Sequence, residues 1–349
     1  MKKMPGSALF IRLAALLLAV VLLPAAALAE EAGSTGAEVE EIEVLSTSAA
    51  SLPLDFTPGS PLKPENFSES VDENGNTVRV YQDSTIRVTL SEKRWFVPNS
   101  KDNKGSRIWM ADVVISDPSQ LRVASFDPEH DFSSVKRTGS VARGAEAVNA
   151  VTAINGDSWG AGNEKHNFGI VYRQGQLFSS RLDDSGRYAM DLLVVDMDGN
   201  FHGIHAAKAG DLDDPSVFEG HPVMDVFSFG PILVENGQVV TDYFGTDREP
   251  GAGGTWMKML SDEPAQRAAI CQVGPLHYLL VTGEKYYENR GLTLPEFAEC
   301  IASLGVQFAY NLDGGQSSIL YYPGLGKVNV PKLKNRDLWD FIYFASAGQ

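Results

Sequence analysis

Hydrophobic and polar residues alternate along short stretches of the chain, with the period of two that is typical of half-buried strands. The alternation begins with Val78, Val80, Ile86, Val88 and Leu90. Further runs rich in β-branched and aromatic residues are separated by turn dipeptides that contain glycine. They predict strands over residues 108–115, 121–126, 168–172, 192–195, 226–234, 268–273, 278–281 and 338–344.

The clearest helical pattern covers residues 293–304. Apolar residues there share one face, Thr293 and Glu296 form a capping box, and Gly305 ends the segment. A shorter helix is expected over residues 140–148. Few helices among many strands predict an α+β fold, with mixed, strand-rich sheets and a few packed helices in a single domain.

The first 78 residues differ from the rest in composition. Residues 1–29 form a signal peptide: basic residues precede an apolar core that is too short to span a bilayer, and Ala27-Leu28-Ala29 gives a cleavage pattern. Residues 30–78 are predicted to be a disordered acidic, Pro-rich linker. We therefore expect a secreted, extracytoplasmic protein after cleavage near Ala29, with no membrane span in the mature chain.

The formal net charge of −16 limits the possible partners, and it becomes −19 once the three cations of the signal are removed. Nucleic acid is excluded as a partner, because its phosphate backbone repels an acidic protein. An anionic glycan could bind only where cations line the site. Cys271 and Cys300 either pair or stay free in the core, and the length of the chain favours free, buried thiols.

The most informative polar cluster is the run over residues 311–318, after a strand predicted at residues 306–310. It combines Asp313 with Gly314, Gly315, Ser317 and Ser318. Glycines allow backbone N–H groups to converge on a ligand, and a carboxylate supplies the acid or base for hydrolysis. The alternative is a structural hairpin turn, for which Asp-Gly is a common sequence.

A similar motif follows the strand predicted over residues 150–154. Asn155 and Asp157 repeat the spacing of Asn311 and Asp313. Because both motifs lie where a strand ends after a helix, we expect the two carboxylates to converge on one cleft. Chance repetition of a three-residue pattern is the alternative.

Residues 311–320, preceded by residues 290–298, resemble the phosphodiester glycosidases. Other segments are similar to that family in the same order: residues 155–159, 167–175, 229–237, 267–270 and 329–336. The resemblance spans about residues 140–344. It departs from the family's pattern at Gln316 and Cys271, where glycine is usual, at Ala268, where threonine is usual, and at Thr282, where an acid is expected.

The resemblance implies a phosphodiester glycosidase domain over residues 79–349. Its reaction would be hydrolysis of a sugar-1-phosphodiester at the anomeric carbon, giving free sugar and a phosphomonoester. Asp313 and Asp157 are the expected catalytic carboxylates, with a plain turn residue as the alternative for Asp157. Glu288, aligned with a family acid, is a third, with a solvated loop glutamate as the alternative. Arg267 is expected to clamp the phosphate, with a structural ion pair as the alternative. The other expected substrate contacts are Asn155, Asn311, Gly314, Gly315, Ser317, Ser318, His166 and Arg336.

No metal and no cofactor are expected, since no His, Cys and Asp residues have the spacing of a zinc site. Residues 196–200 begin like a calcium loop but lack its distal glutamate, so a hairpin turn is expected there. The expected substrate is a sugar phosphate or glycan, on an envelope or extracellular phosphoglycan. Two alternatives stay open: a non-catalytic protein that binds a phosphosugar or glycan, and a metal-dependent phosphodiesterase that cuts the P–O bond.

Overall fold

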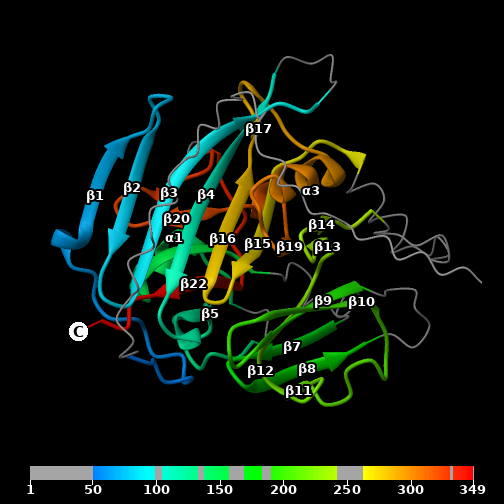
Figure 1. Ribbon diagram of the computed structural model, residues 1–349. Helices are drawn as coiled ribbons and strands as arrows, with labels where there is room; N and C mark the ends of the chain where they lie inside the picture. Colours follow the sequence, from blue (N-terminus) through cyan, green and yellow to red (C-terminus); the bar gives the residue numbers. More distant parts are fainter. Residues whose placement is uncertain are drawn as a thin grey trace, which may run out of the picture. The chain divides into compact units, whose positions relative to one another are not determined.

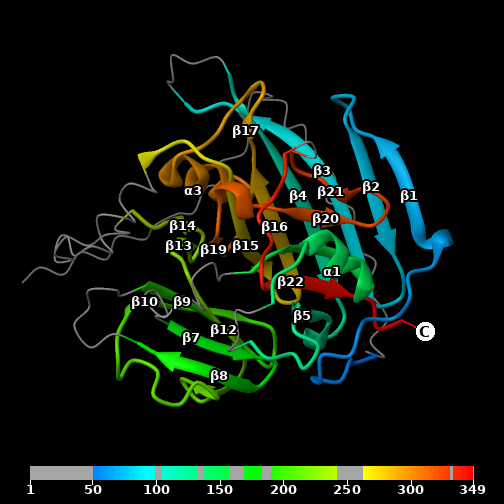
Figure 2. The same ribbon diagram turned by 180° about the vertical axis from the view of Figure 1, so that it is seen from behind.

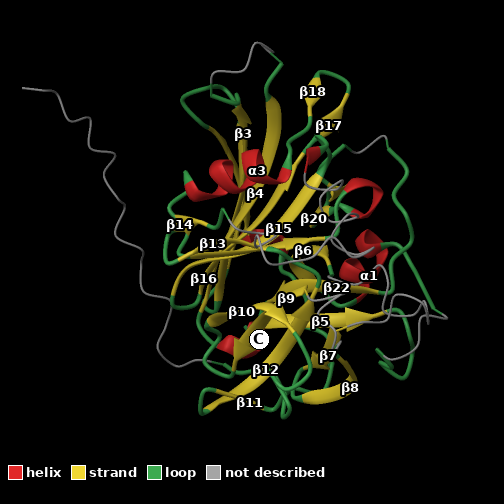
Figure 3. Cartoon of the chain, turned by 90° about the vertical axis from the view of Figure 1, so that its right-hand side faces the viewer, coloured by secondary structure: helices red, strands yellow, loops and turns green. Residues whose placement is uncertain are grey.

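Strands dominate the computed structural model, which describes residues 50–98, 104–132, 137–156, 169–182, 190–241, 262–330 and 333–348 (Figure 1). All of these residues belong to the compact unit of residues 44–349. Figure 3 shows many strands and few helices. In the described part of the chain the two α-helices are α1 (Val141–Ala147) and α3 (Leu294–Ala302), and none is long and apolar enough to span a membrane.

The largest sheet has nine strands and carries the candidate motif around residue 313. Its strands, in spatial order, are β1 (Phe67–Val71), β2 (Thr77–Gln82), β3 (Ile86–Trp95), β4 (Ser106–Ile115), β16 (His277–Gly283), β15 (Arg267–Gly274), β19 (Phe308–Leu312), β13 (Ile232–Glu235) and β14 (Gln238–Val239). The predicted alternation is confirmed in β3, where the side chains of Ile86, Val88 and Leu90 are buried. Their burial on one face matches the pleat of a strand.

Two further sheets and a hairpin complete the described structure. The five-stranded sheet contains β21 (Gly326–Lys327), β20 (Leu320–Tyr322), β6 (Ala150–Asn155), β22 (Asp340–Ala345) and β5 (Leu121–Ser125). The six-stranded sheet contains β10 (Phe201–Ala207), β9 (Met190–Asp196), β12 (His221–Ser228), β7 (Gly169–Arg173) and β8 (Gln176–Arg181), with β11 (Val217–Phe218) paired to β12. Strands β17 (Lys285–Tyr286) and β18 (Asn289–Arg290) form the hairpin.

One apolar core joins the three sheets. It includes Ile270 and Tyr310 from the nine-stranded sheet, Ile342 from the five-stranded sheet and Val195 from the six-stranded sheet. Helix α3 covers the other face of the nine-stranded sheet, where Phe297 packs among buried residues of β15 and β19 (Figure 1). Helix α1 lies beside the five-stranded sheet (Figure 2).

The capping box predicted for the longer helix is confirmed. The backbone N–H of Thr293 donates to Glu296 Oε2 at 2.9 Å, and the N–H of Glu296 donates to Thr293 Oγ1 at 3.4 Å. Cys271 and Cys300 are free and buried, as the length of the chain favoured. Burial raises the pKa of the Cys300 thiol to about 12, so this group stays protonated and behaves as a small apolar residue.

The predicted sheet type needs correction. Strand richness is confirmed, but the strand pairings of the described residues are antiparallel, so the expectation of mixed sheets is wrong and the protein is mostly β. Short turns return most strands beside their predecessors, which produces antiparallel pairs. The single strand predicted over residues 226–234 is two strands, β12 and β13, because the ladder is interrupted at residues 229–231, where Gly230 has φ of +76° and Pro231 has no N–H to donate. The strand predicted at residues 306–310 lies at Phe308–Leu312.

The predicted linker over residues 30–78 is too long at its C-terminal end. Strand β1 pairs with β2, and Phe56 is buried against Phe132. The ordered part begins earlier than predicted because Phe56 is buried in the core and β1 pairs with β2. A single aromatic residue and one short strand do not stand out in a Pro-rich composition. Residues 1–49, with the signal peptide and the start of the linker, lie outside the described residues, so those assignments stay predictions.

A buried arginine holds this N-terminal stretch in place. The guanidinium of Arg122 donates to the carbonyl oxygens of Pro53 at 3.0 Å, Thr57 at 2.9 Å and Ser119 at 3.0 Å. Its Nε donates to the hydroxyl oxygen of Tyr343 at 3.2 Å. A charged donor shared among carbonyls therefore attaches residues 53–57 to β5 and β22.

We expect Arg122→Met to lower the free energy of unfolding by about 2 kcal/mol, because buried carbonyls lose their donor. Urea unfolding of the purified protein measures this change. The matched control is Arg143→Met, on an exposed position of α1, with an expected change below about 0.5 kcal/mol. Equal effects of the two substitutions would contradict the anchoring role of Arg122.

Candidate active site

The turn after β19 is tight enough to require its two glycines. Leu312 pairs with Ala268 of β15, and the chain then enters a short 3₁₀ turn, η3 (Gly315–Ser317). A Cβ atom on Gly314 would lie 2.6 Å from the carbonyl oxygen of Gln266, and Gly315 has φ of +59°. The N–H of Gly315 donates to that same carbonyl at 3.0 Å. Close approach and a left-handed backbone thus explain the Gly-Gly pair.

Asp313 is the titratable group at the centre of this turn. Its side chain is only 16% exposed, and burial raises the pKa of the carboxyl group above its usual range. The Ser317 hydroxyl and the Arg336 guanidinium oppose that rise. Arg336 Nη1 lies 3.5 Å from Asp313 Oδ2, and the backbone N–H of Arg336 donates to the carbonyl of Gln316 at 3.1 Å. A partly buried carboxyl with a raised pKa is suited to proton transfer.

Asn155 connects the second predicted motif to this turn. Its Nδ2 donates to the backbone carbonyl of Asp313 at 2.8 Å, and its Oδ1 accepts the N–H of Ile319 at 3.2 Å. The ends of β6 and β19 therefore meet, whereas the predicted convergence of the two carboxylates stays a prediction. Asp157 and His166 lie outside the described residues, so their roles stay predictions.

Asn311 and Ser318 lie beside Asp313 and bond to the protein's own backbone. Asn311 Nδ2 donates to the carbonyl of Gly230 at 2.8 Å, which fixes the connection between β12 and β13. Ser318 Oγ donates to the carbonyl of Arg267 at 3.0 Å, and Ser318 is fully buried. These contacts hold the turn in position, whereas the buried Ser317 hydroxyl has no hydrogen-bond partner among the described residues.

Arg267 is bonded to the scaffold. Its Nε donates to the carbonyl of Leu292 at 2.9 Å and its Nη2 to the carbonyl of Glu263 at 2.8 Å. Burial lowers the pKa of its guanidinium to about 10, while Glu296 opposes the change. The cation beside Asp313 is Arg336, which was expected only as one of several substrate contacts. A phosphate clamp by Arg267 stays a prediction, and two of its donors already have partners.

Glu288 is exposed on the β17–β18 hairpin, where its carbonyl accepts Nη2 of Arg94 at 2.9 Å. A buried carboxylate of this region is Glu284, which lies two residues after Thr282 and which the sequence pattern did not single out. Glu284 accepts hydrogen bonds from Trp109 Nε1 at 3.0 Å and from the Val330 N–H at 2.7 Å. Because these hydrogen bonds join β4 to the segment at Val330, Glu284 has a structural role.

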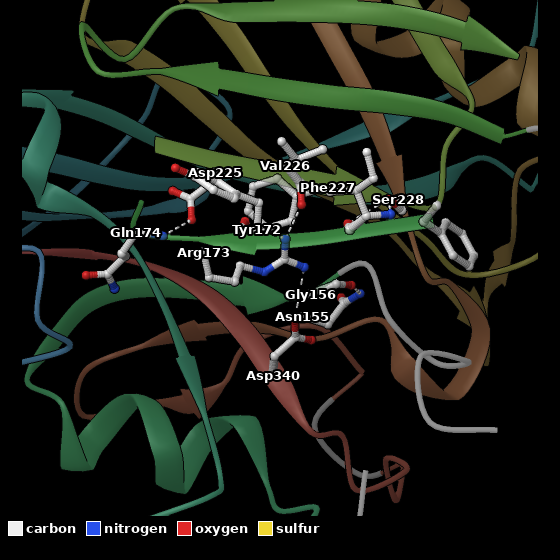
Figure 4. A network of polar contacts seen from close by, with 12 residues as sticks. Asn155, Gly156, Tyr172, Arg173, Gln174, Asp225, Val226, Phe227, Ser228 and Asp340 are labelled. Atoms are coloured by element: carbon white, nitrogen blue, oxygen red, sulfur yellow. Dashed lines mark hydrogen bonds and ion pairs between the residues drawn. The ribbon is translucent and has the colours of Figure 1, made fainter. Parts of the chain in front are cut away.

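A buried ion pair that sequence reasoning missed lies next to Asn155 and Gly156 (Figure 4). Arg173 Nη2 is 3.5 Å from Asp340 Oδ2, and both side chains are almost fully buried. A Cβ atom on Gly156 would lie 2.1 Å from Asp340 Oδ1. The guanidinium also donates to the carbonyl of Val226 and lies 4.3 Å from the ring of Phe227. The pair thus joins β7 to β22 at the turn that follows β6.

One group of possible metal ligands occurs among the described residues. Ligand atoms of Asp196, Asp198 and His221 lie within 4.8 Å of one another. Sequence spacing could not find this group, since His221 comes from another strand. Asp196 already accepts hydrogen bonds from the Asn200 N–H at 2.8 Å and from His202 Nε2 at 2.9 Å. These bonds match the turn expected over residues 196–200.

The sequence profile of the phosphodiester glycosidase family matches residues 148–345. No curated protein sequence matches the chain. The catalytic domain of zebrafish N-acetylglucosamine-1-phosphodiester alpha-N-acetylglucosaminidase, auto-inhibited by its pro-peptide, is similar with a TM-score of 0.56 and 15% identity, over 80% of this chain and 87% of that chain. A hypothetical protein from Synechocystis is similar with a TM-score of 0.49 and 15% identity, over 76% of this chain and 63% of that chain. The similarity to the zebrafish catalytic domain shows that the two proteins share a fold.

We expect Gly314→Ala to lower the free energy of unfolding by about 2 kcal/mol, because the new methyl group meets a backbone carbonyl that cannot move freely. Gly274→Ala is the control, since nothing lies within 4 Å of its added Cβ atom. Thermal and urea unfolding of both variants give the comparison. A loss for Gly314→Ala no larger than for the control would contradict the described turn.

We expect Asp340→Asn to lower the free energy of unfolding by about 3 kcal/mol, since it removes the charge that faces a buried guanidinium. Glu69→Gln breaks the exposed pair with Arg79 and should cost less than about 1 kcal/mol. Urea unfolding at constant salt measures both. If the two losses were equal, the buried pair would not be a structural junction.

Proposed function

Since the chain belongs to the phosphodiester glycosidase family, a family of hydrolases that act on glycosyl bonds, we propose that it cleaves the anomeric C–O bond of a sugar-1-phosphodiester. The products are free sugar and a phosphomonoester. The observation that carries this proposal is the pairing of Asp313 with Arg336 at the glycine turn. It combines a partly buried carboxyl group with the local cation that an acidic chain needs to bind an anionic substrate.

Arg336 is the proposed phosphate ligand. Its side chain is 38% exposed, and its guanidinium can offer paired N–H donors to phosphate oxygens. When phosphate replaces Asp313 as the partner of Arg336, the carboxyl group loses a cation and gains a nearby anion. Both changes raise the pKa of Asp313 further, so substrate binding favours its protonated form.

We propose that Asp313 and a second carboxylate act together as the catalytic groups. Phosphate is a fair leaving group, so the acid has less to do than in ordinary glycosidases, and stabilisation of oxocarbenium-like charge matters more. Asp157 is the proposed second carboxylate, because it follows Asn155 by two residues and Asn155 bonds to Asp313. Secretion, and an envelope or extracellular phosphoglycan as the substrate, belong to the same proposal and rest on the N-terminal sequence.

We expect Asp313→Asn to reduce kcat on a sugar-1-phosphodiester by roughly 10²–10⁴-fold, the usual contribution of a positioned acid or base. Binding of the substrate should persist, since Arg336 remains. Steady-state kinetics and calorimetry measure the two effects. Asp337→Asn removes the same charge from an exposed neighbour of Arg336 and should leave kcat within about twofold.

Full turnover by Asp313→Asn would contradict the assigned role. An unaltered protein that hydrolyses none of a panel of sugar-1-phosphodiesters, yet binds them, would favour the non-catalytic alternative.

A further inference from the structure

The segment that carries Arg336 is attached to the protein by a lysine that the proposed reaction does not use. Lys327 lies in β21, paired with Tyr321 of β20. Its Nζ donates to the carbonyl of Leu333 at 2.7 Å and also to Oδ1 of Asn335. Lys327 is partly buried, so these bonds are shielded from water.

The same segment continues into the turn around Asp313. Asn335 Nδ2 donates to the carbonyl of Ser318 at 3.1 Å, and the N–H of Arg336 donates to the carbonyl of Gln316 at 3.1 Å. The guanidinium of Arg336 then reaches Asp313. A continuous set of polar contacts therefore leads from Lys327 through Asn335 to Arg336.

We infer that Lys327 is a positioning residue, whose ammonium group holds residues 333–335 against the turn so that Arg336 faces Asp313 and the phosphate of the substrate. This inference rests on the proposed function and names how its anion site is built. A flexible arginine loses much of its advantage as a phosphate ligand unless its backbone is fixed, because ordering the side chain costs entropy. Lys327 supplies that fixation at two points of the segment.

The charge of Lys327 matters to this role. Burial lowers the pKa of its ammonium group to about 8, and Glu284, just after β16, opposes the change. The other charged groups of the segment are the exposed Lys334 and Arg336, which faces Asp313. A neutral amine is a weaker donor than an ammonium group. The hold on residues 333 and 335 therefore weakens as pH rises through about 8, and anion binding weakens with it.

The first test measures binding of inorganic phosphate to the full chain by calorimetry at pH 7. Lys327→Met should raise the Kd roughly tenfold, the effect of a misplaced ligand group. Lys334→Met removes the same charge from an exposed lysine of the same segment and should leave the Kd within about twofold. Equal effects of the two variants, or no phosphate binding by the unaltered protein, would overturn the inference.

A double-mutant cycle shows whether Lys327 acts through Arg336. Arg336→Met should also raise the Kd for phosphate, and adding Lys327→Met should cause no further loss. Independent, multiplicative losses would mean that Lys327 contributes only general charge or stability, and would overturn the inference. If Lys327→Met does not fold by circular dichroism, Asn335→Leu interrupts the same contacts and carries the same expectations.

Kinetics separate this inference from the proposed function. On a sugar-1-phosphodiester, kcat/KM of the unaltered protein should fall as pH rises through about 8, and Lys327→Met should lack that fall. Turnover without coupling between Lys327 and Arg336 would overturn the inference alone. Coupled phosphate binding without turnover of any substrate would overturn the proposed function and support the positioning role.

Discussion

The hydrogen bond from Asn155 Nδ2 to the backbone carbonyl of Asp313 is the contact on which the proposed site depends. It joins the end of β6 in one sheet to the end of β19 in another. Residues 158 positions apart in the chain are thereby fixed within 2.8 Å of each other. A buried side-chain amide needs such partners, so the bond stabilises the fold and sets the geometry of the proposed catalytic group at once.

Electrostatics explains why the turn is suited to an anionic substrate in an acidic protein. The formal charge of −16 repels anions at long range, so binding requires a cation within contact distance. Arg336 supplies that cation, and burial keeps the pKa of Asp313 raised. The buried pair of Arg173 and Asp340 does not bind substrate in this account but fixes the turn after β6.

Features that depend on local sequence were predictable, and those that depend on distant contacts were not. The capping box of α3 joins Thr293 and Glu296, three positions apart, and it was predicted correctly. The run with Gly314 and Gly315 forms a tight turn, and its role in binding stays a prediction. Arg122 and Arg173 are fully buried, yet an arginine in a sequence is normally expected at the surface. The partner of Asp313 was equally hidden, because Arg336 reaches it from a closing segment whose course is set by Lys327 and Asn335. Whether strands pair parallel or antiparallel also depends on which strands are neighbours in the sheet. The alternation of apolar and polar residues along one strand does not determine its neighbours.

In the proposed reaction the anomeric C–O bond breaks and the freed sugar takes up an oxygen atom from water, which isotope labelling detects. Purified residues 30–349 would hydrolyse a sugar-1-phosphodiester in water enriched with heavy oxygen, and mass spectrometry would locate the label. We expect label on the anomeric oxygen of the freed sugar, because the C–O bond breaks. Label on the phosphate, with release of sugar-1-phosphate, would show P–O cleavage and contradict it.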